Sequence, residues 1–232
     1  MIKDCFQPKL IAIVGGSGSG KSWLADHLHA LFPEQSAMVS LDSFYLDRSH
    51  VPSGLRERLN YDHPRAIDWA TAETFFIQSR QGNPAWLPSY DFTSHTRQQG
   101  RWCMPRPLLL ADGLWLLCRP EIRRLFDLTI YVDCPEDVRL ARRLARDTAN
   151  RGRSSDSIRE QFQKWVAPMH GQFVEPQKKW ADVILAQPIG KREIKWLSGH
   201  LLNLLVRHRS LAPWAQPVQR LELKAQFMEK PL

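Results

Sequence analysis

A glycine-rich string near the N-terminus has the residue types and spacing of a phosphate-binding loop. Residues 15–22 read GGSGSGKS and fit the pattern GxxxxGK[ST]. Positions without side chains let the backbone curl, so that several N–H groups point at a polyphosphate. The lysine supplies a point charge for the β and γ phosphates, and the final serine can ligate Mg²⁺. We therefore expect nucleotide phosphates and Mg²⁺ at Gly15, Gly16, Ser17, Gly18, Ser19, Gly20, Lys21 and Ser22.

Two acidic residues follow apolar runs at points where a strand would end. Asp42 follows Ala37–Leu41, and Asp112 follows Leu108–Ala111. In open α/β sheets, ligands bind at the carboxyl ends of the strands. A carboxylate there can accept the proton of an attacking hydroxyl and help hold Mg²⁺, which Asp112 can also reach through a water. For Asp42, a helix N-cap before Ser43 remains the alternative.

Further polar and aromatic residues have the chemistry to hold a nucleoside. Asp62 precedes Pro64, and a carboxylate can accept two hydrogen bonds from a cis-diol such as that of ribose. Tyr61 and Phe92 can supply aromatic faces for a base. Tyr90 and His95 are polar aromatic residues, and a hydroxyl and an imidazole can each donate or accept a hydrogen bond.

Arginines gather between residues 139 and 159, in a chain of 232 residues with a net charge of +8. The string TANRGRSSD favours a helix break followed by a new N-cap. Phosphoryl transfer needs cations on the γ-phosphate, and a closing lid excludes water. We expect such a lid to carry Arg143, Arg146, Arg151 and Arg153, although a solvated helix face is the alternative for about half of the cluster.

Apolar runs alternate with helical patterns along most of the chain. Five runs of strand length occur at Leu10–Val14, Ala37–Leu41, Leu108–Ala111, Leu128–Val132 and Val183–Leu185. Helices are predicted at Ser22–Leu31, Asp68–Gln81, Glu136–Thr148, Ser155–Trp180, with an interruption near Pro168, and Arg192–Val206. Continuous apolar strands separated by helices indicate an α/β fold of three layers, with a parallel sheet of about five strands covered on both faces.

Composition excludes several other classes of protein. Four scattered cysteines form no CxxC pair, which argues against a zinc site or a disulfide framework and fits the cytoplasm. No apolar run approaches the roughly 20 residues that span a bilayer, so we expect no membrane partner. The GTPase string NKxD and nucleic-acid-binding motifs are absent from the sequence, so we expect no nucleic-acid partner.

Five segments in order carry a resemblance to a known family. They are LDSFYLD (41–47), NYDHPRAIDW (60–69), SYDFTSHTR (89–97), RRLARDTANRGR (142–153) and PMHGQFVEPQKKWADVIL (168–185). With the phosphate loop ahead of them, the chain resembles the uridine kinase (uridine–cytidine kinase) family, within the group that includes phosphoribulokinase, from about Leu10 to about Leu185. One departure is ADG at Asp112, where uridine kinases usually have glutamate before glycine.

The resemblance implies a role for each matching position. Asp42 would be the general base for the nucleoside 5′-hydroxyl, with Lys21, Arg143 and Arg146 also catalytic. Besides the phosphate loop, Arg151 would bind ATP, and Mg²⁺ would be held by Ser22, Asp42 and Asp112. The nucleoside would be bound by Tyr45, Tyr61, Asp62, Tyr90, Phe92, His95, Arg97, Arg153 and Gln161.

We therefore expect an enzyme that phosphorylates uridine or cytidine from ATP. The kinase domain would span residues 1–211, with a nucleoside-binding insert containing a β-ribbon at about 60–105, a helical lid at about 146–160 and a tail at 212–232. Family resemblance also implies a homo-oligomer. The alternatives are a kinase of another small hydroxyl compound, such as a sugar phosphate or pantothenate, and a non-catalytic ATP-binding regulator.

Overall fold

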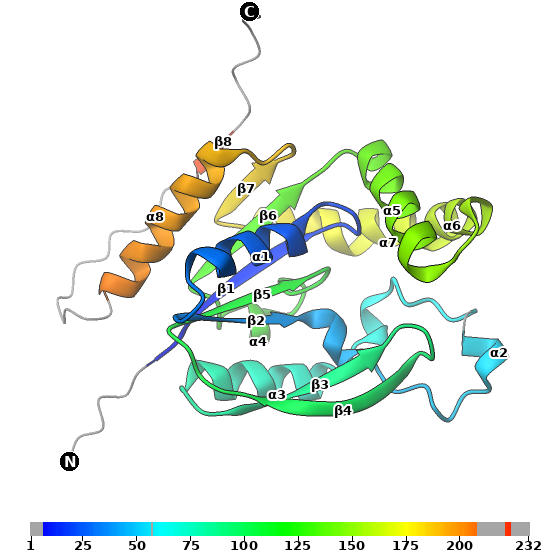
Figure 1. The fold of residues 1–232 in the computed structure, drawn as a ribbon, viewed down its shortest axis with the longest axis horizontal. Helices are drawn as coiled ribbons and strands as arrows, with labels where there is room; N and C mark the ends of the chain where they lie inside the picture. The colour runs from blue at the N-terminus through cyan, green and yellow to red at the C-terminus, as the bar shows by residue number, and fades with distance from the viewer. Residues whose placement is uncertain (1–6, 57, 208–220, 224–232) are drawn as a thin grey trace, which may run out of the picture.

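A parallel β-sheet forms the centre of the molecule in the computed structural model, which describes residues 7–56, 58–207 and 221–223 (Figure 1). Its strands lie in the order β2-β5-β1-β6-β7-β8. Their bounds are β1 Lys9–Gly15, β2 Ser36–Ser40, β5 Leu108–Gly113, β6 Leu128–Asp133, β7 Val183–Ala186 and β8 Leu221–Leu223. The five predicted strands are confirmed, and β8 adds a sixth within the segment that the sequence assigns to a tail.

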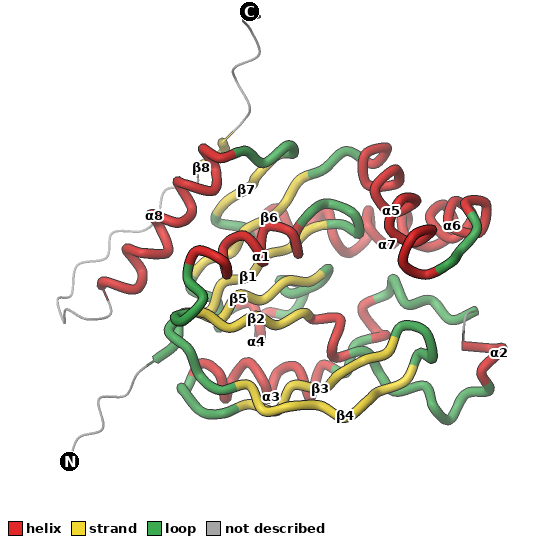
Figure 2. The backbone as a smooth tube through the Cα atoms, in the orientation of Figure 1, coloured by secondary structure: helices red, strands yellow, loops and turns green. Residues whose placement is uncertain are grey.

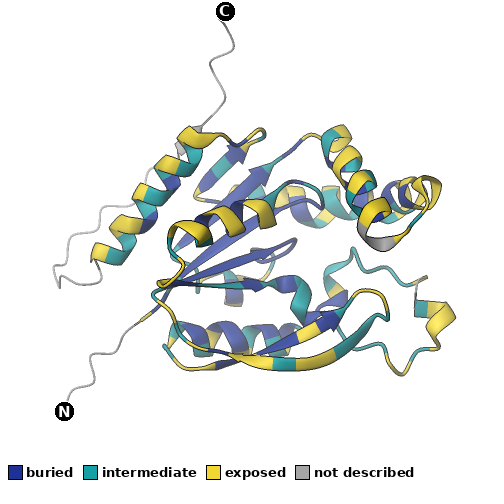
Figure 3. Ribbon diagram, viewed as in Figure 1, coloured by how far each residue is buried: buried dark blue, intermediate teal, exposed yellow. Residues whose placement is uncertain are grey.

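Helices cover both faces of this sheet, as predicted. The helices are α1 Lys21–Leu31, α2 Ser53–Arg56, α3 Trp69–Arg80, α4 Pro120–Arg123, α5 Glu136–Arg151, α6 Ser155–Gln161, α7 Ala167–Met169 and α8 Lys191–Arg207. Alternate residues of β1 enter two separate cores, because successive side chains of a strand point to opposite faces. One core joins β1 to α1 and α8, and the other joins it to α3, so the buried sheet lies between two helical layers (Figure 3).

A two-stranded antiparallel ribbon lies outside the main sheet. It consists of β3 (Ala85–Asp91) and β4 (Thr96–Cys103), and it contacts α3 and a short 3₁₀ turn at Leu41–Phe44. Figure 2 shows its strands running beside α3. This ribbon confirms the one expected around residues 89–97, and Figure 1 shows its tip on the same side of the molecule as α5 and α6.

The interruption predicted near Pro168 is not a break. Helical backbone continues from α6 through α7, with π-helical turns at Phe162–Val166 and His170–Val174 and a 3₁₀ turn at Glu175–Trp180. A proline lacks an N–H and its ring clashes with the carbonyl four residues earlier. Wider turns on both sides of Pro168 accommodate that ring without ending the helix.

None of the helices in the described part of the chain combines the length and the hydropathy that crossing a bilayer requires.

Candidate active site

The phosphate loop joins β1 to α1 in the conformation its glycines permit. Gly18 and Gly20 have φ of 81° and 94°, values that side-chain-bearing residues rarely adopt. Gly20 is the N-cap of α1 and has no side chain that could accept from the first N–H groups, and the first turn of α1 contains no acidic residue. The positive end of α1 and its unused N–H groups therefore face the loop without a competing carboxylate, which is the arrangement that attracts an anion.

Two of the three predicted metal ligands meet beside this loop. The Ser22 hydroxyl donates to a carboxylate oxygen of Asp112, 2.6 Å away, and Asp112 is only 5% exposed. Asp112 lies near the end of β5, opposite Ser40 of the neighbouring strand β2. An oxygen donor pair at the carboxyl edge of the sheet suits a hard cation such as Mg²⁺, so the residues fit the predicted metal site.

Asp42 lies just beyond β2, within the 3₁₀ turn Leu41–Phe44. Ser40 is the N-cap of that turn, and its side chain accepts a hydrogen bond from the backbone N–H of Asp42. The capping role that was the alternative for Asp42 is therefore filled by Ser40. The carboxylate of Asp42 instead lines a cavity that also contains Lys21.

This cavity has a volume of about 540 Å³ and brings together most of the predicted site. Its size falls within the usual range for pockets that hold small molecules. From the predicted set, its walls contain Ser17, Lys21, Asp42, Tyr45, Tyr61, Asp62, Tyr90, Phe92, His95, Arg143, Arg146, Arg153 and Gln161. The other lining residues, which sequence reasoning did not single out, are Thr93, Leu114, Ser154 and Ser157.

Aromatic side chains from three segments form one wall of the cavity. The Tyr45 ring lies 5.2 Å from the Tyr90 ring and 6.1 Å from the Phe92 ring, between ring centres. The Tyr45 hydroxyl donates to the Tyr61 carbonyl, and burial raises the pKa of Tyr45 well above its ordinary value. Burial and the neighbouring Tyr61 hydroxyl likewise raise the pKa of Tyr90. These phenols therefore remain neutral donors at physiological pH.

Tyr61 and His95 form a stacked pair at the tip of the β3–β4 ribbon. Their ring centres are 4.3 Å apart and their planes differ by 9°. His95 has a φ of 55°, a left-handed conformation that is uncommon outside glycine and asparagine. Such backbone strain persists only where the surrounding structure imposes it, and functional sites are where it gathers.

Asp62 lines the same cavity, near Arg143 and Arg146 of α5 and near Arg153, which lies between α5 and α6. Burial, with a contribution from the Asp147 carboxylate, raises the pKa of the Asp62 carboxyl above its ordinary value, while the guanidinium groups of Arg143 and Arg153 oppose the rise. Nearby positive charges favour the ionised form of a carboxyl group, in which both oxygens accept hydrogen bonds. The cavity thus presents a carboxylate that can accept from two hydroxyl groups at once.

The arginines of the predicted lid are tied to the phosphate loop and to each other. Arg143 donates to the Ser17 hydroxyl and to the Gln161 side chain, both at 2.9 Å. Arg153 donates to the same oxygen of Gln161 at 2.5 Å. The helix break predicted there is confirmed, since α5 ends at Gly152 with φ of 61° and Ser154 is the N-cap of α6.

Among the predicted nucleoside-binding residues, Arg97 has a different place in the described structure. Arg97 donates to the carbonyl oxygens of Tyr45 and Phe44 and pairs with Asp68 at 3.0 Å, so its guanidinium is committed to holding the ribbon against the 3₁₀ turn. It therefore does not line the cavity. Arg151 lies in the last turn of α5, and its side chain falls outside the described part of the chain.

Sequence reasoning missed Asp147, which anchors two lid arginines. It is fully buried, and its carboxylate accepts from Arg146 at 2.8 Å and pairs with Arg143 at 3.4 Å. The signal was available, because Arg143 and Asp147 are four residues apart on one helix, the spacing at which opposite charges meet.

Curated relatives match most of the chain. It is 40% identical over 183 residues to a uridine kinase of Clostridium novyi, covering 78% of this chain and 88% of that protein. It is 41% identical over 182 residues to a uridine kinase of Brevibacillus brevis, covering 78% and 85%.

Solved structures share the fold at lower identity. Phosphoribulokinase from Rhodobacter spheroides aligns with a TM-score of 0.60 and 18% identity, over 78% of this chain and 70% of that one. D-glycerate 3-kinase from Cryptococcus neoformans aligns with a TM-score of 0.51 and 17% identity, over 71% and 78%. A family model matches residues 10–194, and together with the curated relatives it shows that the chain belongs to the phosphoribulokinase/uridine kinase family.

Proposed function

We propose that this chain transfers the γ-phosphoryl group of ATP to the 5′-hydroxyl of uridine or cytidine. The observation that carries the proposal is that Lys21 of the phosphate loop and Asp42 line the same cavity as an aromatic and hydrogen-bonding wall. A donor phosphate and an acceptor hydroxyl must meet in one site for direct transfer. The relatives at 40% and 41% identity are named uridine kinases, which supports the same acceptor here.

The residues of the cavity account for each part of the transfer. Asp42 takes the proton of the 5′-hydroxyl as that oxygen bonds to the γ-phosphorus and the bond to the β-phosphate oxygen breaks. Lys21, Arg143 and Arg146 are the cations available to the transferring group. Mg²⁺, held with the donor by Ser22, Asp112 and Asp42, would neutralise phosphate charge.

The acceptor half of the cavity has the groups that a pyrimidine ribonucleoside needs. Asp62, with Arg153 and Gln161 nearby, would hold the ribose hydroxyls. Phe92 and the stacked Tyr61–His95 pair would provide aromatic faces for the base. The neutral Tyr90 hydroxyl and the His95 imidazole can each donate or accept, so they suit both uracil and cytosine. The homo-oligomer expected from the family and the cytoplasmic location expected from the scattered cysteines stay predictions.

A turnover screen tests this function. Purified protein with ATP and Mg²⁺ is given uridine, cytidine, pantothenate or a sugar phosphate, and ADP release is followed with a coupled assay. We expect ADP release with the two nucleosides alone and a 5′-monophosphate product by mass spectrometry. Turnover of a sugar phosphate or pantothenate with no response to either nucleoside would assign the site to a different acceptor. ATP binding with no turnover of any acceptor would favour a regulator.

A further inference from the structure

One position of the phosphate loop requires glycine for lack of space and not for its backbone conformation. Gly16 has no positive φ, unlike Gly18 and Gly20. A Cβ atom at Gly16 would lie 2.8 Å from Nδ1 of His170 and 2.9 Å from Nη1 of Arg139. Real Cβ atoms do not approach other heavy atoms so closely, so Gly16 leaves room for these two side chains. Neither His170 nor Arg139 lines the large cavity.

Arg139 brings a buried positive charge against the loop. It is 2% exposed, and its Nε donates to the Cys134 carbonyl at 3.2 Å. Its guanidinium pairs with the carboxylate of Glu136, 3.8 Å away on a side chain that is 64% exposed. Nη1, which faces Gly16, has no hydrogen-bond partner among the described residues. A buried cation with so weak a partner is costly unless a nearby anion balances it.

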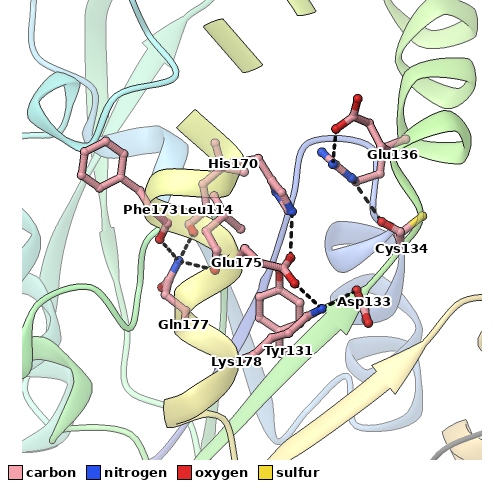
Figure 4. Close-up of polar contacts among 12 residues, drawn as sticks. Leu114, Tyr131, Asp133, Cys134, Glu136, His170, Phe173, Glu175, Gln177 and Lys178 are labelled. Carbon is pink, nitrogen blue, oxygen red and sulfur yellow. Dashed lines mark hydrogen bonds and ion pairs between the residues drawn. The ribbon is translucent and has the colours of Figure 1, made fainter. Parts of the chain in front are cut away.

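A network of hydrogen bonds and ion pairs holds His170 on the side of its ring that faces away from Gly16. Figure 4 shows its ring pointing at Glu175, with Nε2 lying 3.2 Å from the carboxylate. Glu175 also accepts from the Tyr131 hydroxyl and from Lys178, and Lys178 reaches Asp133 at 3.0 Å. The remaining ring nitrogen, Nδ1, faces Gly16 and has no hydrogen-bond partner among the described residues.

Gln177 fastens the same helical segment to the chain after β5. This fully buried side chain donates to the carbonyls of Leu114 and Phe173 (Figure 4). It also accepts from the backbone N–H of Leu117. All of its polar atoms are therefore used inside the protein. These hydrogen bonds hold the segment that carries His170 firmly in place beside the phosphate loop.

We propose that Arg139 and His170 are positioning residues for the donor, which support the phosphate loop at Gly16, with Arg139 adding a buried positive charge beside the ATP phosphates. This inference rests on the proposed ATP-dependent function. It gives a role at the site to the segment around His170, although none of residues 168–185 lines the large cavity. The negative phosphates supply the counter-charge that Glu136 cannot.

The first test replaces the charge of Arg139. Arg139→Met keeps most of the volume, Arg139→Lys keeps the charge, and Arg192→Met is the matched control on the exposed face of α8. ATP and uridine affinities are measured separately by calorimetry. We expect Arg139→Met to weaken ATP binding at least about tenfold, the loss of one interaction with a charged group, and uridine binding less than about twofold. Arg139→Lys should recover part of the loss. Unchanged ATP affinity in Arg139→Met would overturn the proposal.

The second test uses the space at Gly16 and does not depend on the first. Gly16→Ala, His170→Ala and the double variant form a cycle, with Gly199→Ala as control because a Cβ there meets nothing within 4 Å. Removing the ring relieves the clash with His170 and leaves the close approach to Arg139, so the double variant should lose less ATP affinity than the two single losses combined. Strictly additive losses would contradict the contact. ATP binding is measured without an acceptor. A failure to phosphorylate uridine would therefore contradict the proposed function and would not change the outcome of this test.

Discussion

Replacing Asp147 by asparagine removes the negative charge that holds two lid arginines while keeping the shape of the side chain. Asp147 is fully buried, and its carboxylate lies 2.8 Å from Nε of Arg146 and 3.4 Å from Nε of Arg143. Its backbone carbonyl also accepts from the N–H groups of Gly152 and Arg153 where α5 ends. An asparagine would place an amide N–H donor opposite the guanidinium donors. Arg143, which is the buried arginine of the two, would then lose its compensating charge.

The size of the effect follows from the burial of each partner. Removing one partner of a buried ion pair costs about 3–5 kcal/mol. The lower end applies because Arg143 keeps its bonds to Ser17 and Gln161, and because the Arg146 side chain is 40% exposed and gains little from pairing. We therefore expect the free energy of unfolding to fall by about 3 kcal/mol, and Tm by about 6–12 °C for a domain of this length.

Thermal unfolding followed by circular dichroism measures this change directly. Asp26→Asn is the matched control, because Asp26 lies on the exposed face of α1 and makes the same change of charge. It should leave Tm within about 2 °C, as exposed substitutions do. If Asp147→Asn unfolds at the same temperature as the control, the carboxylate contributes no net stability and the anchoring role is refuted.

Three further outcomes are expected. Asp42→Asn should lower kcat at least about a hundredfold and change ATP affinity less than about threefold, as loss of a general base does; turnover within a few-fold of wild type would remove Asp42 from that role. His95→Ala should raise KM for uridine more than KM for ATP, and equal rises would argue against contact with the base. Burial, and then Arg139, lower the pKa of His170, so the unfolded chain takes up the proton first as pH falls below about 6.5. Stability should therefore decline from about pH 6.5 downward, and His170→Gln should flatten that decline in urea titrations; an unchanged slope would show that His170 is not the group responsible.

The sheet could be predicted from the sequence because its strands are buried on both faces. Continuous apolar runs such as Leu10–Val14 have no other stable location in a chain of this composition, and observed bounds differ by at most two residues. β8 was not predicted, since three residues after a proline-containing stretch carry too little pattern.

The candidate site was predictable where a local motif carries the chemistry and not where a distant contact decides it. The phosphate loop and the Gly152 helix break depend on neighbouring residues, so their patterns sufficed. Arg97 has the residue type of a ligand contact, yet tertiary structure places its guanidinium on Phe44, Tyr45 and Asp68. His170 shows the opposite case, because its proximity to Gly16 arises only when α5 and the helical segment after it fold against the loop.

A crystal structure with uridine and a non-hydrolysable ATP analogue bound together tests the central claim most directly. We predict that both ligands occupy the cavity shared by Lys21 and Asp42, with the 5′-hydroxyl between the Asp42 carboxylate and the terminal phosphate. Uridine found in a separate pocket, or with its 5′-hydroxyl turned away from Asp42, would contradict direct transfer at this site.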